Sequence, residues 1–406
     1  MNNRHSLDDL ALPFDDLGVG PAVQQVDRLI ARAAALGASD IHVEPYETSV
    51  RIRYRLDGVL HLAGVLAPHQ HAALVSRIKV LSGLDIAEKR RPQDGRLRVD
   101  RPHPQPPLDL RVSVLATHFG EKVVLRLLDR NALRLDLDAL GFDPAPLALL
   151  RTAIHRPHGI VLVTGPTGSG KTTTLYAALS EIDTDRLNVS TVEDPIEYDL
   201  PGVNQTQARP DIGLGFAEAL RAFLRQDPDV LMVGEIRDTE TAEIAVRAAL
   251  TGHLVLATLH TNDAAGAITR LADMGVAPYL IASSLRLVAA QRLLRTLCPA
   301  CKRSVQTADG TTTYEPVGCP QCNGTGYRGR TAILEALPLV SLDALEAVRA
   351  ADSATLRALG QREGWPSLAK AAGRAVASGL TSKAEALRVT EGLPDPTRAG
   401  SHHERV

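Results

Sequence analysis

Residues 159–176 read GIVLVTGPTGSGKTTTLY, and this stretch decides the fold of the central part of the chain. The apolar run GIVLVT is typical of a buried strand, the sequence after Lys171 continues as a helix, and the glycine-rich segment 165–172 connects the two. The glycines let the backbone curl until its N–H groups point at phosphate oxygens, and the helix N-terminus adds partial positive charge. The stretch therefore predicts a P-loop, the phosphate-binding element of many ATPases.

Two side chains of the P-loop have roles that follow from their chemistry. Lys171 is predicted to reach the β- and γ-phosphates of ATP, and the Thr172 hydroxyl is predicted to bind Mg²⁺. We therefore expect ATP and Mg²⁺ as cofactors. The residues predicted to hold the nucleotide are Gly165, Pro166, Thr167, Gly168, Ser169, Gly170, Lys171, Thr172 and Thr173.

Three further apolar runs, NVSTVED, DVLMVGE and HLVLATLH, alternate with helical segments and end in polar residues. Short Val- and Leu-rich runs of this kind are typical of a parallel sheet that helices cover on both faces. The sequence therefore predicts an α/β fold with a parallel sheet for residues 147–297. In such sheets the functional side chains gather at the carboxyl ends of the strands.

Carboxylates follow two of these predicted strands. Glu235 comes directly after DVLMVG and is predicted to polarise or orient the attacking water. Its neighbour is Gly234, where many P-loop enzymes have an aspartate that holds Mg²⁺. Glu193, Asp194 and Glu197 end another strand, and one of them could replace that aspartate at the metal. We favour Glu193.

A histidine stands at each end of the run from His253 to His260. A histidine in such a place is more often a packed or capping residue than a catalytic one. His260 lies at the carboxyl end, beside Thr261 and Asn262, so it is the better candidate for a γ-phosphate sensor.

Two pairs of arginines have two possible interpretations. Arg111 and Arg126 fall on apparent strands of the N-terminal part, whereas Arg221 and Arg225 lie four apart in the helical segment ALRAFLRQDPD. They could form surface salt bridges, or some could contact a γ-phosphate as arginine fingers do. The pattern alone leaves both open.

All four cysteines lie close together in the sequence, as Cys298, Cys301, Cys319 and Cys322. Two CxxC pairs separated by seventeen residues match the spacing of a four-thiolate Zn²⁺ site. Because four protein ligands leave no open position for water, this zinc is predicted to be structural rather than catalytic.

The pattern of apolar, polar and turn-forming residues in the rest of the chain predicts its domain organisation. Alternating strands, a hairpin turn at Asp57–Gly58 and helical segments predict a small α+β domain before the P-loop part, interrupted by the proline-rich stretch 101–107. The expected divisions are a flexible N-terminus (1–20), the α+β domain (21–130), a linker (131–146), the ATPase core (147–297), the four-cysteine segment (298–327), a helical region (328–390) and a disordered tail (391–406).

The composition indicates which partners and which cellular compartment to expect. The net charge of −2 and the aromatic content of 3% provide neither a basic surface nor many stacking platforms for nucleic acid, so none is expected. There is no apolar run of the length that a signal peptide or a membrane-spanning helix needs. We therefore expect a cytoplasmic protein.

With these residues in hand, the chain resembles the secretion and pilus-assembly ATPases of the GspE/PulE family over residues 21–390. The motifs that carry the resemblance are SDIHVEPYE, RPQDGR, EKVVLRLLDR, TVEDPIEY, FLRQDPDVLMVGEIRD, TGHLVLATLHTND and the paired CxxC. The glycine before Glu235 matches the pattern of this family.

The resemblance implies a PAS-like N-terminal domain, a RecA-like core and a C-terminal metal-binding region. It implies a cytoplasmic homo-hexamer that binds an inner-membrane platform protein and so lies at the inner membrane without entering it. The hexamer would use ATP to move pilin or pseudopilin subunits out of the membrane. It favours phosphate contacts for Arg111 and Arg126, and also for Arg221 and Arg225.

Several alternatives stay open at this point. A pilus-retraction or DNA-uptake motor resembles the same core but generally lacks the four cysteines. A nucleic-acid-translocating ATPase and a nucleotide-binding scaffold without turnover are more distant possibilities. The separate N-terminal docking domain of many secretion ATPases is not expected, so recruitment to the platform protein is expected through other surfaces, above all the zinc region.

Overall fold

The computed structural model describes residues 19–100, 107–128, 135–306 and 310–391. The chain divides into two compact units, one of residues 1–132 with 317–328 and one of residues 133–316 with 329–406. The flexible N-terminus predicted over 1–20 lies almost wholly outside the described residues, as do most of the disordered tail predicted over 391–406 and the proline-rich loop. So does the predicted domain boundary at residue 130.

The N-terminal unit is built on a six-stranded sheet in the order β3-β2-β1-β6-β5-β4. Every pair of neighbouring strands is antiparallel. The strands are β1 (Asp40–Pro45), β2 (Val50–Leu56), β3 (Val59–Leu66), β4 (Gln93–Val99), β5 (Leu108–Thr117) and β6 (Gly120–Leu128). The helical elements are α1 (Ala22–Ala35), η2 (Pro68–Gln70) and α2 (His71–Leu81).

One face of this sheet forms the core of the unit. Alternate strand residues such as Ile41 and Ile52 are buried together with Leu29 of α1 and Ile78 of α2. The predicted hairpin at Asp57–Gly58 is confirmed, since β2 and β3 pair antiparallel around it and both turn residues have positive φ, 47° and 85°. Apolar and polar residues that alternate along the strands thus give the sheet one apolar face, which packs against the helices, and one polar face.

The second unit contains a seven-stranded sheet in the order β15-β12-β7-β11-β10-β8-β9. Its strands are β7 (Gly159–Thr164), β8 (Val189–Glu193), β9 (Asn204–Gln207), β10 (Val230–Val233), β11 (Leu254–Leu259), β12 (Leu285–Leu297) and β15 (Tyr327–Pro338). From β12 through β9 each neighbouring pair is parallel, which confirms the predicted parallel sheet.

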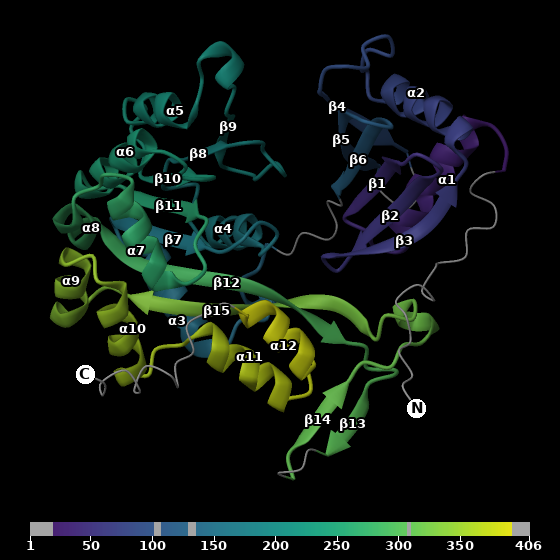
Figure 1. Cartoon of the computed structure of the whole chain (residues 1–406). Helices are drawn as coiled ribbons and strands as arrows, with labels where there is room; N and C mark the ends of the chain where they lie inside the picture. The colour runs from purple at the N-terminus through teal and green to yellow at the C-terminus, as the bar shows by residue number, and fades with distance from the viewer. Residues whose placement is uncertain (1–18, 101–106, 129–134, 307–309, 392–406) are drawn as a thin grey trace, which may run out of the picture. The chain divides into compact units, whose positions relative to one another are not determined.

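Helices cover both faces of this sheet (Figure 1). Along β7, Ile160 and Leu162 enter one apolar core, whereas Val161 and Val163 enter the other. The helical elements are α3 (Pro144–Ile154), α4 (Lys171–Ser180), α5 (Phe216–Phe223), α6 (Thr239–Leu250), α7 (Ala264–Asp273), α8 (Pro278–Ser284), α9 (Leu342–Arg349), α10 (Ser353–Arg362), α11 (Leu368–Ala377), α12 (Lys383–Thr390) and the short turns η4 (Asp138–Leu140) and η5 (Pro210–Ile212). The short turn η6 (Pro320–Cys322) belongs to the segment 317–328 of the first unit.

Three strands of this sheet, β9, β12 and β15, lie where the sequence analysis predicted none. Strand β12 passes through the end of the predicted core, and β15 occupies residues 327–338, at the start of the region predicted to be helical. A run such as TAILEALPL fits a buried strand and a buried helix equally well, so periodicity could not decide between them. A small hairpin, β13 (Arg303–Gln306) with β14 (Thr312–Glu315), separates the two CxxC pairs.

In the described parts of the chain, none of the helices combines the length and apolarity needed to span a bilayer.

Candidate active site

The P-loop joins β7 to α4 at the carboxyl edge of the parallel sheet. Gly165, Gly168 and Gly170 all have positive φ, at 148°, 78° and 87°. A Cβ at Gly165 would lie 2.5 Å from the carbonyl oxygen of Gln291, so both conformation and space require glycine there. The loop therefore has the curled backbone that phosphate binding needs.

The Lys171 side chain is folded back into this loop. Its Nζ donates to the carbonyl oxygens of Gly165 at 2.9 Å and Pro166 at 3.3 Å, and the residue is only 8% exposed. Burial lowers the pKa of Lys171 to about 8, although the nearby Glu235 opposes this shift. The ammonium group is thus held by carbonyl oxygens at the loop, where a phosphate could replace them as its partner.

Glu235 and His260 come from neighbouring strand ends and meet at the same edge. The Oε1 atom of Glu235 lies 2.9 Å from His260 Nε2, and its Oε2 accepts from Arg237 Nε at 2.8 Å. On its other side, His260 Nδ1 lies 3.5 Å from Lys171 Nζ. The structure thus brings together three of the predicted catalytic residues.

The other histidine has a different place. His253 Nδ1 lies 2.8 Å from the carbonyl oxygen of Ala248, near the end of α6. The capping interpretation is therefore confirmed for His253.

Glu193, at the end of β8, is almost completely buried. The Tyr176 hydroxyl of α4 donates to it in a short contact, and Thr191 Oγ1 and Gln205 Nε2 donate at 2.7 and 3.0 Å. Burial and this carboxylate raise the pKa of the Tyr176 phenol. Tyr176 therefore ties the first helix after the P-loop to the end of β8, while metal binding by Glu193 stays a prediction.

Two threonines join the ends of β7 and β11. The hydroxyls of Thr164 and Thr261 lie 2.7 Å apart, and the Thr261 N–H donates to Thr164 Oγ1 at 3.0 Å. This contact fixes the start of the P-loop relative to the segment that carries His260.

Gln291 is a P-loop contact that the sequence analysis missed. From β12 its Nε2 donates to the carbonyl oxygen of Ser169 at 2.8 Å, and its Oε1 accepts from Thr174 Oγ1 at 2.7 Å. The only available signal was a glutamine inside the otherwise apolar run LVAAQ. Because Gln291 is 1% exposed, these bonds hold the loop and the first turn of α4 together.

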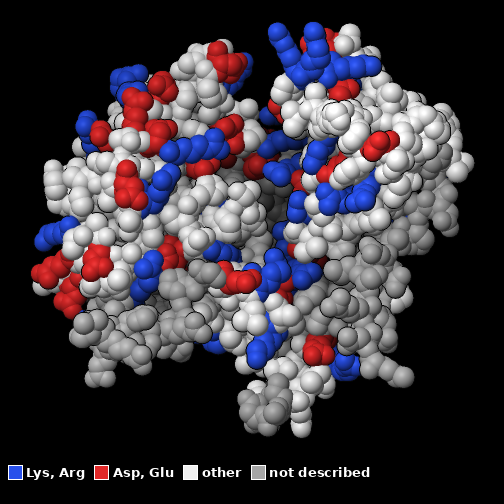
Figure 2. Space-filling model, in the orientation of Figure 1, with Lys and Arg blue, Asp and Glu red and all other residues white. Residues whose placement is uncertain are grey.

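The arginines of the second unit have protein partners on the surface. Arg221 in α5 pairs with Glu240 in a short contact and with Glu218 at 3.6 Å, and Arg225, just beyond the helix, donates to the Arg221 carbonyl oxygen. Acidic and basic side chains are interspersed over this part of the surface (Figure 2). Contacts from these two arginines to a nucleotide remain predictions.

Arg111 and Arg126 lie directly opposite each other on β5 and β6 of the N-terminal unit. Arg126 Nε donates to Asp40 Oδ1 at 2.9 Å, and the Arg126 side chain is 57% exposed. The strand register continues this row to Arg55 on β2 and Arg96 on β4. Four arginines and one aspartate thus share one row of the sheet. The net positive charge of this row favours the binding of anions.

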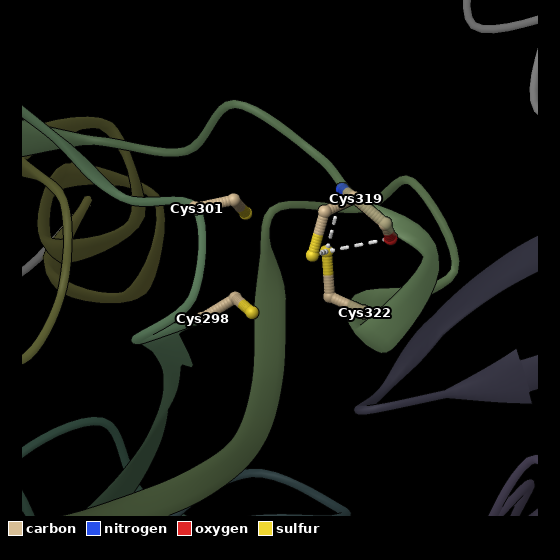
Figure 3. A group of neighbouring side chains, drawn as sticks. All are labelled: Cys298, Cys301, Cys319 and Cys322. Atoms are coloured by element: carbon tan, nitrogen blue, oxygen red, sulfur yellow. Dashed lines mark hydrogen bonds between the residues drawn. The ribbon is translucent and has the colours of Figure 1, made fainter.

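The four cysteine sulfurs lie within 4.8 Å of one another (Figure 3). The Sγ atoms of Cys319 and Cys322 are 3.7 Å apart, close to the roughly 3.8 Å edge of a zinc–thiolate tetrahedron with bonds of about 2.3 Å. The N–H groups of Cys319 and Gly326 lie 3.2 Å from Cys322 Sγ, which suits a thiolate. The donor set therefore fits a closed, structural metal site.

The fold and the site together define a P-loop ATPase with a parallel sheet. The chain belongs to the Type II/IV secretion system protein family, whose model matches residues 15–388. This membership confirms the resemblance to secretion and pilus-assembly ATPases and makes the chain an ATP hydrolase.

Individual relatives agree with this assignment. The chain is 54% identical to Type II secretion system protein HxcR of Pseudomonas aeruginosa over 386 residues, 91% of this chain and 77% of that protein. It is 49% identical to the Type IV pilus assembly ATPase PilB of Myxococcus xanthus, with 94% and 69% covered.

Two solved structures have a similar fold. The pilus retraction motor PilT with bound ADP has a TM-score of 0.61 at 28% identity, with 91% of this chain and 97% of that chain covered. The Legionella pneumophila ATPase DotB has a TM-score of 0.65 at 24% identity, with 92% and 96% covered. The second likeness concerns the fold alone.

Proposed function

We propose that this chain is a hexameric motor that hydrolyses Mg·ATP to assemble the pseudopilus of a type II secretion system or a type IV pilus. The observation that carries the proposal is the meeting of Lys171, His260 and Glu235 at one sheet edge. It occurs in a chain whose relatives, at 49–54% identity, are named for type II secretion and for pilus assembly.

The proposed roles follow from the contacts of each side chain. Lys171 neutralises the β- and γ-phosphates, and Thr172 binds Mg²⁺. Glu235 orients the attacking water, while His260, in contact with both Glu235 and Lys171, senses the γ-phosphate. Glu193 is proposed to support the metal through its position at the end of β8.

Oligomer formation would complete the site. We propose that the ring is a homo-hexamer in which Arg111 and Arg126 act as phosphate ligands, with Arg221 and Arg225 in the same role from the core. The exposed Arg126 side chain and the excess of positive charge in its row support this role. Hydrolysis would then be linked to movement of the N-terminal unit.

The compartment and the partners belong to the same proposal. The motor is proposed to be cytoplasmic and to lie against the inner membrane through a platform protein, with pilin or pseudopilin subunits as its indirect cargo. The zinc-pinned segment 298–327 is proposed as the dock, because a metal-fixed loop presents side chains at little entropic cost. No nucleic acid is expected.

A replacement experiment in the bacterium that carries this chain tests the function. Glu235→Gln in the chromosomal copy should abolish secretion of the exported proteins or the appearance of surface pili. Wild-type secretion and piliation after complete deletion of the gene would overturn the proposal.

The second candidate is a pilus-retraction motor, which the similarity to PilT favours. Deletion of a retraction motor should leave more surface pili, whereas deletion of a pilus-assembly motor should leave none and deletion of a type II secretion motor should stop export without changing the number of pili. Counting pili and measuring export on the deletion strain therefore separate these functions.

A further inference from the structure

The segment that follows His260 is held by three consecutive contacts from the C-terminal part of the second unit. Arg292 Nη2, on β12, donates to the Asn262 carbonyl oxygen at 2.6 Å. Arg357 of α10 pairs with Asp263, Nε to Oδ2 at 2.6 Å. Glu335 of β15 accepts from the Ala264 N–H at 2.8 Å.

Asp263 is the centre of this arrangement. Its Oδ1 accepts from the Gly266 N–H at 2.9 Å and so caps α7, while Oδ2 is bound by Arg357. The Asp263 side chain is 10% exposed, so removal of Arg357 would take the ion-pair partner from a nearly buried carboxylate and leave it with the Gly266 N–H and the more distant charge of Arg292. The position of this carboxylate therefore depends on α10.

Glu335 makes the second connection. Besides Ala264, its carboxylate accepts from the Leu368 N–H at 3.4 Å, at the start of α11. Burial raises the pKa of Glu335, and Arg292 opposes this shift. The beginning of α7 is thus joined through one carboxyl group to the start of α11.

These contacts end close to the reacting groups. Asn262, Asp263 and Ala264 are the second, third and fourth residues after His260, whose Nε2 lies 2.9 Å from Glu235. A shift of α10 or β15 would therefore move the backbone that carries this imidazole. A cavity of about 90 Å³ lined by Arg357, Trp365 and Lys370 lies beside the ion pair, so a changed side chain has room there.

We propose that Arg357 and Glu335 are positioning residues for ATP hydrolysis, acting through Asp263 and Ala264 on the segment that carries His260. The C-terminal helices thereby set the hydrolysis rate although they contribute no group to the nucleotide site. This inference rests on the proposed role of His260. Misplacement of a catalytic group by about 1 Å can cost about 100-fold in rate, so a partial loss of this support should be measurable.

Steady-state hydrolysis by the full chain tests the proposal. Arg357→Gln should lower kcat by about 10-fold and change the KM for ATP by less than about 2-fold, because nucleotide binding depends on the P-loop. Arg357→Lys should recover part of the rate. Asp263→Asn, which keeps a capping oxygen but loses the charge, should resemble Arg357→Gln. The matched control is Lys370→Gln, which removes an exposed cation from the same cavity.

A double-mutant cycle separates this inference from the role of His260. If Arg357 acts through His260, adding Arg357→Gln to His260→Ala should cost much less than the roughly 10-fold it costs alone. Wild-type kcat in Arg357→Gln, or full additivity in the double variant, would overturn the positioning role while His260→Ala remains slow. Wild-type hydrolysis by His260→Ala itself would instead overturn the proposed role of His260.

Discussion

The carboxylate of Glu235 contacts the imidazole of His260, with 2.9 Å between Oε1 and Nε2. The two residues follow β10 and β11, which are neighbours in the parallel sheet, so the register of these strands brings them together. Glu235 also accepts from Arg237, so two partners direct its carboxylate. This is the arrangement expected of a group that must hold an attacking water in one orientation.

Glu235→Gln should therefore separate binding from chemistry. The amide keeps the size of the side chain but cannot polarise water as a carboxylate does, so kcat should fall by about 100-fold or more. The affinity for ATP, measured with a fluorescent analogue, should stay near that of the wild type. Lys171→Ala should by contrast weaken both binding and turnover, and equal loss of affinity in the two variants would contradict these roles.

The pH dependence of ATP binding should report the proton on Lys171. Burial lowers the pKa of this lysine to about 8 in the unliganded protein, and phosphates favour its charged form. As the pH rises above about 8, a growing fraction of the free protein has lost this proton and must take it up on binding, so ATP affinity should fall, by up to about 10-fold per pH unit. Below about pH 7 the lysine contribution should be constant.

Calorimetric titrations in buffers of different ionisation enthalpy measure this proton uptake. Lys171→Arg is the control, because an arginine keeps its charge throughout this range and should remove the pH dependence. Affinity of the wild type that does not change between about pH 7 and 9.5 would contradict the assignment.

Gln291 should stabilise the P-loop through its contacts with Ser169 and Thr174. Gln291→Ala removes one bond to the Ser169 carbonyl oxygen and one to the Thr174 hydroxyl, and leaves both groups buried. We expect the free energy of unfolding to fall by about 2 kcal/mol and the KM for ATP to rise several-fold. Thr174→Ser, which keeps the hydroxyl, is the control; denaturation and kinetics that match the wild type in Gln291→Ala would contradict the role.

The features that could be predicted from the sequence are those that depend on a few consecutive residues. The glycines of the P-loop, the turn at Asp57–Gly58 and the CxxC pairs are local patterns, and each needs only its own few residues to be recognised. The carboxyl ends of parallel strands can be inferred in the same way, which is why the sequence predicts that Glu235 and His260 lie near the P-loop.

Contacts that depend on tertiary structure could not be predicted. Gln291 is 122 positions from its partner Ser169, and its role exists only because β12 lies beside β7. Asp40 lies 86 positions from Arg126, and only the register of β1 against β6 brings them together. A buried glutamate such as Glu193 also gave no sign that Tyr176 would donate to it.

The last prediction concerns the four cysteines, whose sulfurs lie within 4.8 Å of one another, with the Sγ atoms of Cys319 and Cys322 3.7 Å apart. A metal there would supply folding free energy to a segment of turns and a short hairpin with few buried apolar residues. The purified protein should contain about one zinc ion per chain. Cys298→Ser should lose that zinc and make residues 298–327 sensitive to protease, while Ala300→Ser, in the same CxxC pair, should do neither. Because no cysteine lies among the P-loop residues, ATP affinity should change little in either variant. Wild-type protein that is active and protease-resistant but free of metal would show that the cluster is a thiol pocket rather than a zinc site.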